Sequence, residues 1–384
     1  MMMNNNRRTD RLLVGGFVSV LFLMSAAFLL HPTVKFSELE NRYLQNAPRF
    51  TWDNLVSKAF AEDAEKYVTD HFPYRDDWVW VKSSLEQLRL QQENNGIYKG
   101  EDGYLFEKFA KPDYAELQKY AEAVKRFAAS HPEVDMTFML APTSIGMYPE
   151  RLPWKAPFYS EAKVNHWIAD RIGQDVTFMD GFDFLRPHAS EDLYYRTDHH
   201  WTTLGAYYAY AAYAEQMGWQ PLSKDQFRIE TVSESFLGSY HTRSQFSGLK
   251  PDSIQAYIPK KPVSTEIYIA DTDTTVTGLY DDSFLGKKDQ YSYFLGGVHA
   301  LTTIKTSLDP QTADQGKLLV LKDSYAHSFI PFLTQHVSQI DMIDIRYYNG
   351  NIGDYMKENG ITDVLMMFNT ATFVENGEIL KIDD

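Results

Sequence analysis

The chain contains no cysteine among its 384 residues, which excludes disulfide bonds, a thiol nucleophile and thiolate metal sites. Positive charge is also scarce: 37 Lys and Arg stand against 52 Asp and Glu, a net charge of -15. A surface of this sign repels phosphate backbones, so we expect no nucleic-acid partner. Hydrophobic residues (44%) and charged residues (23%) have ordinary globular frequencies, which excludes a disordered chain or one with many membrane spans.

One long apolar run stands near the N-terminus. Residues 12–30 carry no charge, and as a helix they would span about 28 Å, close to the hydrocarbon thickness of a bilayer. Three arginines and one aspartate precede the run, so the positive-inside rule keeps residues 1–11 in the cytoplasm and exports the rest. The alternative is a cleavable signal peptide, but the run is longer than a usual signal core. We expect an uncleaved single-pass anchor at residues 12–30, with the folded domain in an extracellular or periplasmic space.

The sequence of the exported part predicts a lead-in segment followed by one large α/β domain. Residues 31–106 form the lead-in, which has a helical stretch and a strand–turn–strand at its end. In residues 107–384, short apolar strands alternate with helices, which favours a parallel sheet flanked by helices. Alternating Thr- and Tyr-rich pieces at about 225–315 predict a β-rich insertion. We expect helices at 114–129, 161–172, 203–217, 325–336 and 352–358, and strands at 134–140, 176–179, 318–321, 340–345 and 364–368.

The first segment with catalytic potential is TDHHWT, at residues 197–202. In an extended loop, residues i and i+2 point the same way, so the Asp198 carboxylate is placed to orient the His200 ring. A carboxylate on one ring nitrogen fixes the tautomer and leaves the other nitrogen basic.

The second segment is LLVLKDSYAHSF, at residues 318–329. A buried strand ends just before Ser324, and a helix is predicted to begin at about Tyr325. Ser324 would then lie at the C-terminal edge of a parallel sheet, where open α/β folds place reactive groups. Free N–H groups at the start of the helix would favour negative charge and stabilise an oxyanion.

Each segment also has a structural interpretation. Ser324 suits the N-cap of a helix. Asp198 and the two histidines form either a hydrogen-bonding loop or a ligand set for zinc or iron. Because no Glu or His at helical ligand spacing accompanies them, we expect no metal. The glycine-containing segments do not match a phosphate-binding fingerprint either, so we expect no other cofactor. Trp201 is either a core anchor or a platform for a substrate.

Taken together, TDHHWT and LKDSYAHSF resemble the DHHW protein family. That family looks related to the alginate O-acetyltransferase accessory proteins of the AlgJ and AlgX type, and so to SGNH-like hydrolases. Five further segments resemble the family pattern: SELENR (37–42), DHFPYRD (70–76), NGIYKGEDGYLF (95–106), TFMLAPTSIGMYP (137–149) and DIRYYN (344–349).

The resemblance implies a catalytic triad of Asp198, His200 and Ser324, with His200 preferred over His199 because Asp-x-His is the shared spacing. It implies an SGNH-hydrolase-like fold and an extracytoplasmic role in O-acetylating a cell-surface or secreted polysaccharide. The acetyl group would come through a membrane-bound O-acyltransferase partner. Thr143 and Ser144 stand where alginate members often carry a basic residue, which argues against an acidic, alginate-like acceptor.

In the expected mechanism, the Ser324 oxygen attacks an acetyl carbonyl and a sugar hydroxyl then displaces the acetyl-enzyme. The Ser324 N–H and a second donor from the turn at Gly297 would hold the oxyanion. Tyr325 and Arg346 are weaker candidates for contact with the oxyanion. Trp201 and His199 are candidates for substrate binding. A non-catalytic glycan-binding scaffold and a secreted acetylesterase remain alternatives, since the same triad serves transfer and hydrolysis.

Overall fold

The computed structural model of the chain describes residues 3–37, 42–89, 91–308 and 314–383. Residues 38–41 of the SELENR segment and residues 309–313 of the β-rich segment lie outside the described residues. The chain divides into two compact units, residues 1–91 with 245–247, and residues 92–244 with 248–384. The lead-in was expected to extend to residue 106, but residues 92–106 belong to the larger unit because their aromatic side chains are buried in its core.

The smaller unit begins with the apolar segment. Its first helix contains a stretch, Thr9–Leu30, that is long and apolar enough to cross a membrane and is not buried within the structure. A membrane anchor and a signal sequence share these properties. The helical stretch of the lead-in is interrupted around Pro73, because proline cannot continue a helix. The elements are α1 (Met3–Leu30), β1 (Phe36–Ser37), β2 (Arg42–Tyr43), α2 (Trp52–Val56), α3 (Ala59–Asp70) and α4 (Arg75–Leu88).

An eight-stranded sheet forms the centre of the larger unit. Its strand order is β11-β10-β12-β14-β13-β15-β6-β7, and the five strands from β14 to β7 are parallel. In chain order the bounds are β6 (Asp135–Ala141), β7 (Thr177–Asp180), β10 (Thr265–Ile269), β11 (Thr274–Thr277), β12 (Leu301–Thr306), β13 (Asp314–Lys322), β14 (Val337–Ile343) and β15 (Asp363–Asn369). The Leu318–Leu321 run of β13 is fully buried, as expected for a strand covered on both faces.

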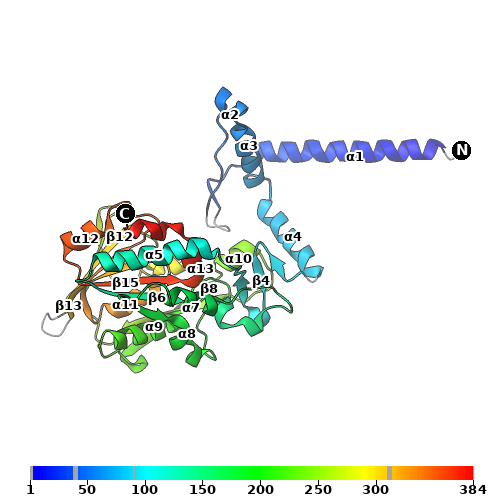
Figure 1. Ribbon diagram of the computed structural model, residues 1–384. Coiled ribbons are helices and arrows are strands. Elements are labelled where there is room, and N and C mark those ends of the chain that lie inside the picture. Colours follow the sequence, from blue (N-terminus) through cyan, green and yellow to red (C-terminus); the bar gives the residue numbers. More distant parts are fainter. Residues whose placement is uncertain (1–2, 38–41, 90, 309–313, 384) are drawn as a thin grey trace. The chain divides into compact units, whose positions relative to one another are not determined.

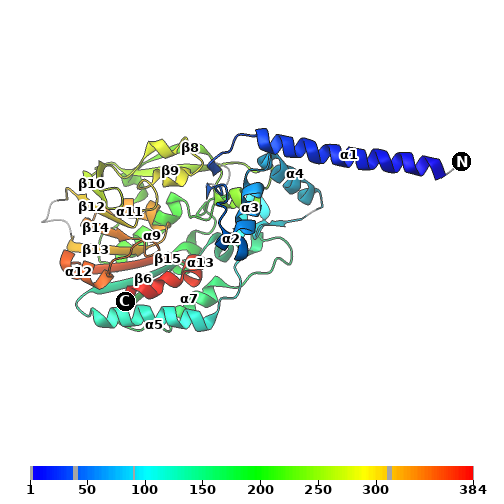
Figure 2. The same ribbon diagram turned by 90° about the horizontal axis from the view of Figure 1, so that it is seen from above.

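Helices cover both faces of this sheet (Figures 1 and 2). On one face Tyr120 of α5 contacts Phe373 of α13, and on the other Tyr210 of α9 stacks on Phe332 of α11. The helices are α5 (Tyr114–Ser130), α6 (Ser144–Met147), α7 (Glu161–Ala169), α8 (Gly181–Leu185), α9 (Thr203–Gln216), α10 (Ser239–Ser244), α11 (Ala326–Leu333), α12 (Ile352–Asn359) and α13 (Thr370–Glu375). The predicted α/β class, a mostly parallel sheet flanked by helices, is confirmed.

The β-rich segment is an insertion only in part. Its strands β10, β11 and β12 extend the central sheet, with β12 pairing antiparallel to β14. A separate two-stranded antiparallel sheet consists of β8 (Phe227–Phe236) and β9 (Asp252–Pro259). A third small sheet comes from the strand–turn–strand segment: β3 (Glu93–Asn94), β4 (Ile97–Lys99) and β5 (Leu105–Glu107).

Candidate active site

Ser324 lies in a turn between β13, which ends at Lys322, and α11. The turn is held by the buried Asp323 carboxylate, whose Oδ1 accepts the Tyr325 N–H at 2.8 Å. Its Oδ2 accepts the backbone N–H of Asn369 at 2.7 Å and the side-chain amide of Asn369 at 2.8 Å. Because Asn369 ends β15, this carboxylate fixes the Ser324 turn to the neighbouring strand at the C-terminal edge of the parallel sheet.

The structure brings Ser324, His200 and Asp198 into one hydrogen-bonded chain. His200 Nε2 lies 2.7 Å from Ser324 Oγ, and His200 Nδ1 lies 2.6 Å from Asp198 Oδ1. With the Nδ1–H donated to the carboxylate, Nε2 is left to accept the Ser324 O–H, which is the arrangement that a general base requires. His199 faces elsewhere: its Nδ1 lies 2.6 Å from Ser239 Oγ.

Asp198 is positioned by backbone groups of its own loop and of α10. Its Oδ1 also accepts the His200 N–H at 3.0 Å, and its Oδ2 accepts the Ser239 N–H at 2.7 Å. The segment before α10 approaches so closely that a Cβ on Gly238 would lie 2.2 Å from the Asp198 Cβ. Burial alone would raise the pKa of Asp198, but the two histidines outweigh it and hold this pKa well below its usual value.

The His200 ring is packed as well as hydrogen-bonded. Tyr291 stacks on it with centroids 3.6 Å apart and planes within 11°. The Tyr291 hydroxyl donates to the Ser324 carbonyl oxygen at 3.1 Å and lies 3.0 Å from Ser328 Oγ. Burial and the charge of His199 lower the pKa of His200 to about 4, against the opposing effect of Asp198. His200 is therefore a neutral, fixed ring at neutral pH.

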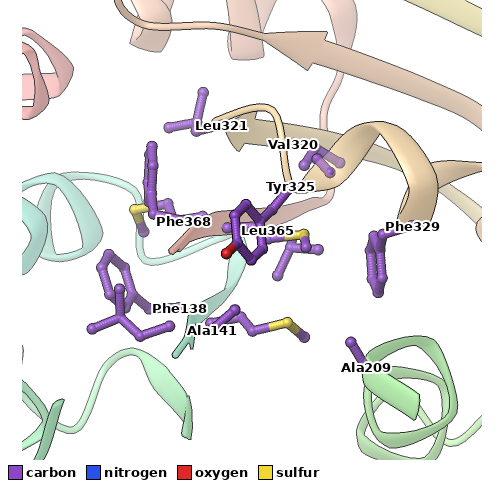
Figure 3. Packing of buried hydrophobic residues seen from close by; sticks show 14 of the residues in the cluster. Phe138, Ala141, Ala209, Val320, Leu321, Tyr325, Phe329, Leu365 and Phe368 are labelled. Atoms are coloured by element: carbon purple, nitrogen blue, oxygen red, sulfur yellow. The ribbon is translucent and has the colours of Figure 1, made fainter. Parts of the chain in front are cut away.

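Two predicted contact residues are buried and have structural partners. Trp201 is 0% exposed, and its Nε1–H donates to the Tyr325 carbonyl oxygen and to Ser328 Oγ, both at 3.1 Å. The Tyr325 hydroxyl donates to the His199 carbonyl oxygen, and its ring belongs to the hydrophobic core shown in Figure 3. A buried side chain cannot form a platform for substrate, so the structure assigns Trp201 to the core and Tyr325 to the junction of the segments that carry His199 and Ser324.

The expected oxyanion donors differ in availability. In the described part of the chain, the Ser324 N–H donates no hydrogen bond, whereas the Tyr325 N–H is taken by Asp323. The Gly297 N–H donates to the Phe294 carbonyl oxygen at 3.4 Å within a turn of positive φ. That turn is the reason for glycine at this position, so the structure favours Ser324 over Gly297 as a donor.

Arg346 belongs to a buried ionic cluster beside the site. Its guanidinium donates to both oxygens of Asp344, at 2.8 and 2.6 Å. Lys322 Nζ donates to Asp344 Oδ2 at 3.1 Å and lies 2.8 Å from His327 Nε2. Burial and the Lys322 charge hold the pKa of His327 well below its usual value, so His327 accepts from Lys322 as a neutral ring. The cluster places positive charge near His200 but leaves Arg346 paired.

Asp198, His199 and His200 also form the one acidic and histidine group among the described residues that is compact enough to surround a cation. One ligand atom from each lies within 4.8 Å of the others. However, the 2.6 Å separation of His200 Nδ1 and Asp198 Oδ1 is that of a hydrogen bond, shorter than the spacing of two ligands that each lie about 2 Å from a tetrahedral zinc ion. The donor set therefore fits a proton relay better than a metal centre.

Several residues of the site were not found from the sequence. Gly238, Ser239 and Tyr291 come from the β-rich segment, and Asp323 and Asn369 tie the Ser324 turn to β15. Asp323 precedes Ser324 at the end of a buried strand, which was a usable signal for a turn-capping carboxylate. Nothing local marks Tyr291, because its role depends on a contact with a loop about 90 residues earlier in the chain.

A mostly parallel sheet flanked by helices, with a Ser–His–Asp hydrogen-bonded chain at its C-terminal edge, places the larger unit among the α/β proteins. The family profile described as DHHW protein matches residues 143–343, just over half of the chain. The chain therefore belongs to the DHHW protein family. Asp198, His199, His200 and Trp201 are the DHHW residues of this sequence.

Two solved structures share this fold, and a third is more distantly similar. A DHHW family protein from Eubacterium siraeum aligns with 27% identity and a TM-score of 0.65, covering 75% of this chain and 96% of that one. Bacillus cereus PatB1, solved with a sulfonyl adduct, aligns with 19% identity and a TM-score of 0.64, covering 75% and 98%. The O-acetyltransferase domain of Pseudomonas putida AlgJ aligns with 18% identity and a TM-score of 0.44, covering 73% and 93%. No curated protein matches the chain.

Proposed function

We propose that this DHHW protein is an extracytoplasmic O-acetyltransferase that transfers acetyl groups to hydroxyls of a cell-surface or secreted polysaccharide. One observation carries the proposal: His200 Nε2 lies 2.7 Å from Ser324 Oγ while His200 Nδ1 lies 2.6 Å from Asp198. A scaffold would not need a serine, a buried histidine and a buried carboxylate in this order. The arrangement is that of nucleophilic acyl transfer.

In the proposed reaction, His200 removes the Ser324 hydroxyl proton as the oxygen attacks the acetyl carbonyl of a donor. The tetrahedral intermediate collapses, its leaving group takes the proton from His200, and acetyl-Ser324 remains. A sugar hydroxyl then attacks this ester while His200 accepts its proton, and Ser324 leaves and is reprotonated. Asp198 keeps the ring orientation throughout and stabilises the imidazolium. The free Ser324 N–H is the proposed first donor to the oxyanion.

The donor and the location are proposed from the N-terminus and the family resemblance. The apolar helix α1 would anchor the chain in the membrane and keep the α/β unit outside the cytoplasm. A membrane-bound O-acyltransferase would then present the acetyl group at the same membrane. The acceptor is a neutral or weakly charged glycan, because the chain itself carries a net charge of -15 and would repel a strongly acidic polymer.

The test is formation of an acyl-enzyme. The full chain in detergent micelles is mixed with p-nitrophenyl acetate or a sulfonyl fluoride, a probe chosen because PatB1 has been solved with a sulfonyl adduct. Intact mass and peptide mapping should place one adduct on Ser324. Ser324→Ala should lose it, while Ser283→Ala, which changes an exposed serine, should keep it. Equal labelling of the wild type and Ser324→Ala would refute the proposal.

The acceptor distinguishes transfer from hydrolysis. Acetate release and acetyl transfer are compared with and without oligosaccharides from the cell surface. We expect the acetyl group to appear on the oligosaccharide and acetate release to fall when the acceptor is added. An acetylesterase would instead release acetate at the same rate in both cases, since water is its acceptor.

A further inference from the structure

The His200 ring lies between two other rings. Tyr291 stacks at 3.6 Å and 11°, and His199 lies at 3.7 Å with a plane angle of 38°. Two rings cannot share one face of an imidazole at these separations, so they occupy opposite faces. The His199 side chain is 36% exposed whereas that of His200 is 6% exposed. His199 is therefore partly open to solvent, while His200 is shielded.

One carboxylate serves both histidines. Asp198 Oδ1 lies 2.6 Å from His200 Nδ1, and Asp198 Oδ2 lies 3.6 Å from His199 Nδ1. Across the described ranges, no second carboxylate comes within 4.0 Å of either ring. A single negative charge balances a single imidazolium, and a second imidazolium in contact with the first would be repelled at this distance. The pair therefore takes up its first proton easily and its second with difficulty.

We infer that His199 is a positioning residue that takes the first proton of this pair, so that His200 remains an unprotonated base in mildly acidic surroundings. The inference rests on the proposed role of His200 as the base of the triad. It assigns a separate duty to each histidine of the DHHW segment. The proton that the pair gains from solvent resides on the exposed ring, and His200 Nε2 keeps its lone pair for the Ser324 O–H.

The charges that face the two rings favour this distribution. Burial disfavours the charged form of His199, but Asp198 outweighs it and raises the pKa of His199, with help from Glu107 of β5 and Asp323 of the nucleophile turn. Burial, the charge of His199 and the more distant Arg346 lower the pKa of His200.

The other groups around the rings fit the same assignment. Burial lowers the pKa of Lys288, while the charge of Asp198 opposes this effect. His327 stays neutral because burial holds its pKa well below the usual value. The tyrosines that pack against the pair stay neutral because burial raises the pKa of each: Tyr240, Tyr291 and Tyr325.

Two substitutions separate charge from structure. His199→Gln removes the titrating group and keeps a polar side chain that can reach Ser239. His199→Lys places a permanent positive charge at the same partly exposed position. If His199 acts through its charge, the pKa of His200 rises by about one unit or more in His199→Gln, a tenfold gain in proton affinity, and stays low in His199→Lys.

The measurement is NMR titration of the imidazole nitrogens in the full chain, labelled with 15N-histidine and held in micelles. His200 is assigned by its loss in a His200→Gln variant. A rise in the His200 pKa in His199→Gln alone supports the inference, whereas equal His200 values in all three proteins overturn it. The rate of Ser324 labelling by a sulfonyl fluoride is measured against pH in parallel. The pH below which this rate falls, its acid limb, should rise by the same amount in His199→Gln.

These readouts fail independently. If the triad is not catalytic, Ser324 is never labelled, yet the ring titrations still report whether His199 lowers the pKa of His200. If the triad is catalytic but the inference is wrong, labelling proceeds with the same acid limb in the wild type and His199→Gln. A purely structural role for His199 would lower labelling in both variants without moving the limb.

Discussion

At the scale of single residues, substitutions of Tyr291 test how the candidate base His200 is held in place. The Tyr291 ring covers one face of His200, and its hydroxyl donates to the Ser324 carbonyl oxygen. That carbonyl also accepts the His327 N–H at 3.2 Å, so removing the hydroxyl leaves no orphaned acceptor. Tyr291→Phe should therefore cost about 1 kcal/mol of stability, the value of one ordinary hydrogen bond, and should slow Ser324 labelling by less than about tenfold.

Tyr291→Leu removes the stacked ring as well. The His200 ring then loses its packing on that face. The Tyr291 side chain that leucine replaces is buried. We expect a further loss of about 1–3 kcal/mol in the free energy of unfolding, by analogy with other large-to-small substitutions in cores, and a larger drop in labelling than in Tyr291→Phe. Thermal unfolding is recorded beside the labelling rate. A folded leucine variant with the wild-type rate would show that the stack does not position His200.

At the scale of elements, Gly238 shows how neighbouring segments define the site. It immediately precedes α10 and contacts the Asp198 loop so closely that no side chain fits between them. The Gly238 N–H donates to Thr197 Oγ1 at 3.1 Å, and its carbonyl oxygen accepts the Thr242 N–H at 3.0 Å. With the peptide held on both sides, the added methyl of Gly238→Ala would have to displace Asp198. We expect about 1–3 kcal/mol of destabilisation, as for other overpacked sites, and a strong loss of Ser324 labelling.

Gly286→Ala is the matched control for this prediction, because a Cβ there meets no atom within 4 Å. It should retain the labelling rate and the melting temperature of the wild type. If Gly238→Ala labels at the control's rate, the close approach of α10 does not determine the position of Asp198.

The elements themselves were predicted better than their pairing. Helix α9 and strand β15 were expected within one residue of their bounds, because apolar periodicity and the Thr202 cap are local signals. Pairing of β12 with β14 joins residues about 40 positions apart, and nothing in either strand specifies its partner. Asp198, His200 and Ser324 were predicted because they lie beside predicted elements and match a family pattern. Tyr291 and Gly238 were missed because their function comes only from tertiary contact.

For the whole molecule, the proposed activity requires that the larger unit stays at the membrane. α1 is the only stretch among the described residues that passes the length and composition test for a span. If it is an uncleaved anchor, intact mass of the protein purified from membranes includes residues 12–30, and protease added outside the cell degrades the α/β unit. A signal peptide cleaved after the small residues Ser25, Ala26 and Ala27 would give a mature N-terminus just beyond them and a protein released from the membrane.

Leu21→Arg tests the anchor directly. A charge near the middle of a spanning helix costs about 2.5–3.5 kcal/mol of insertion free energy, so we expect a reduced membrane-bound fraction and less exported protein. Thr9→Arg adds the same charge at the end expected in the cytoplasm, where the positive-inside rule favours it, and should leave export unchanged. Both variants keep the triad intact, so purified protein should label at Ser324 as the wild type does. Polysaccharide acetylation in cells should fall only in Leu21→Arg, because an acetyl donor in the membrane can be used only by a chain held beside it. Equal acetylation by both variants would show that the larger unit acts without its membrane helix.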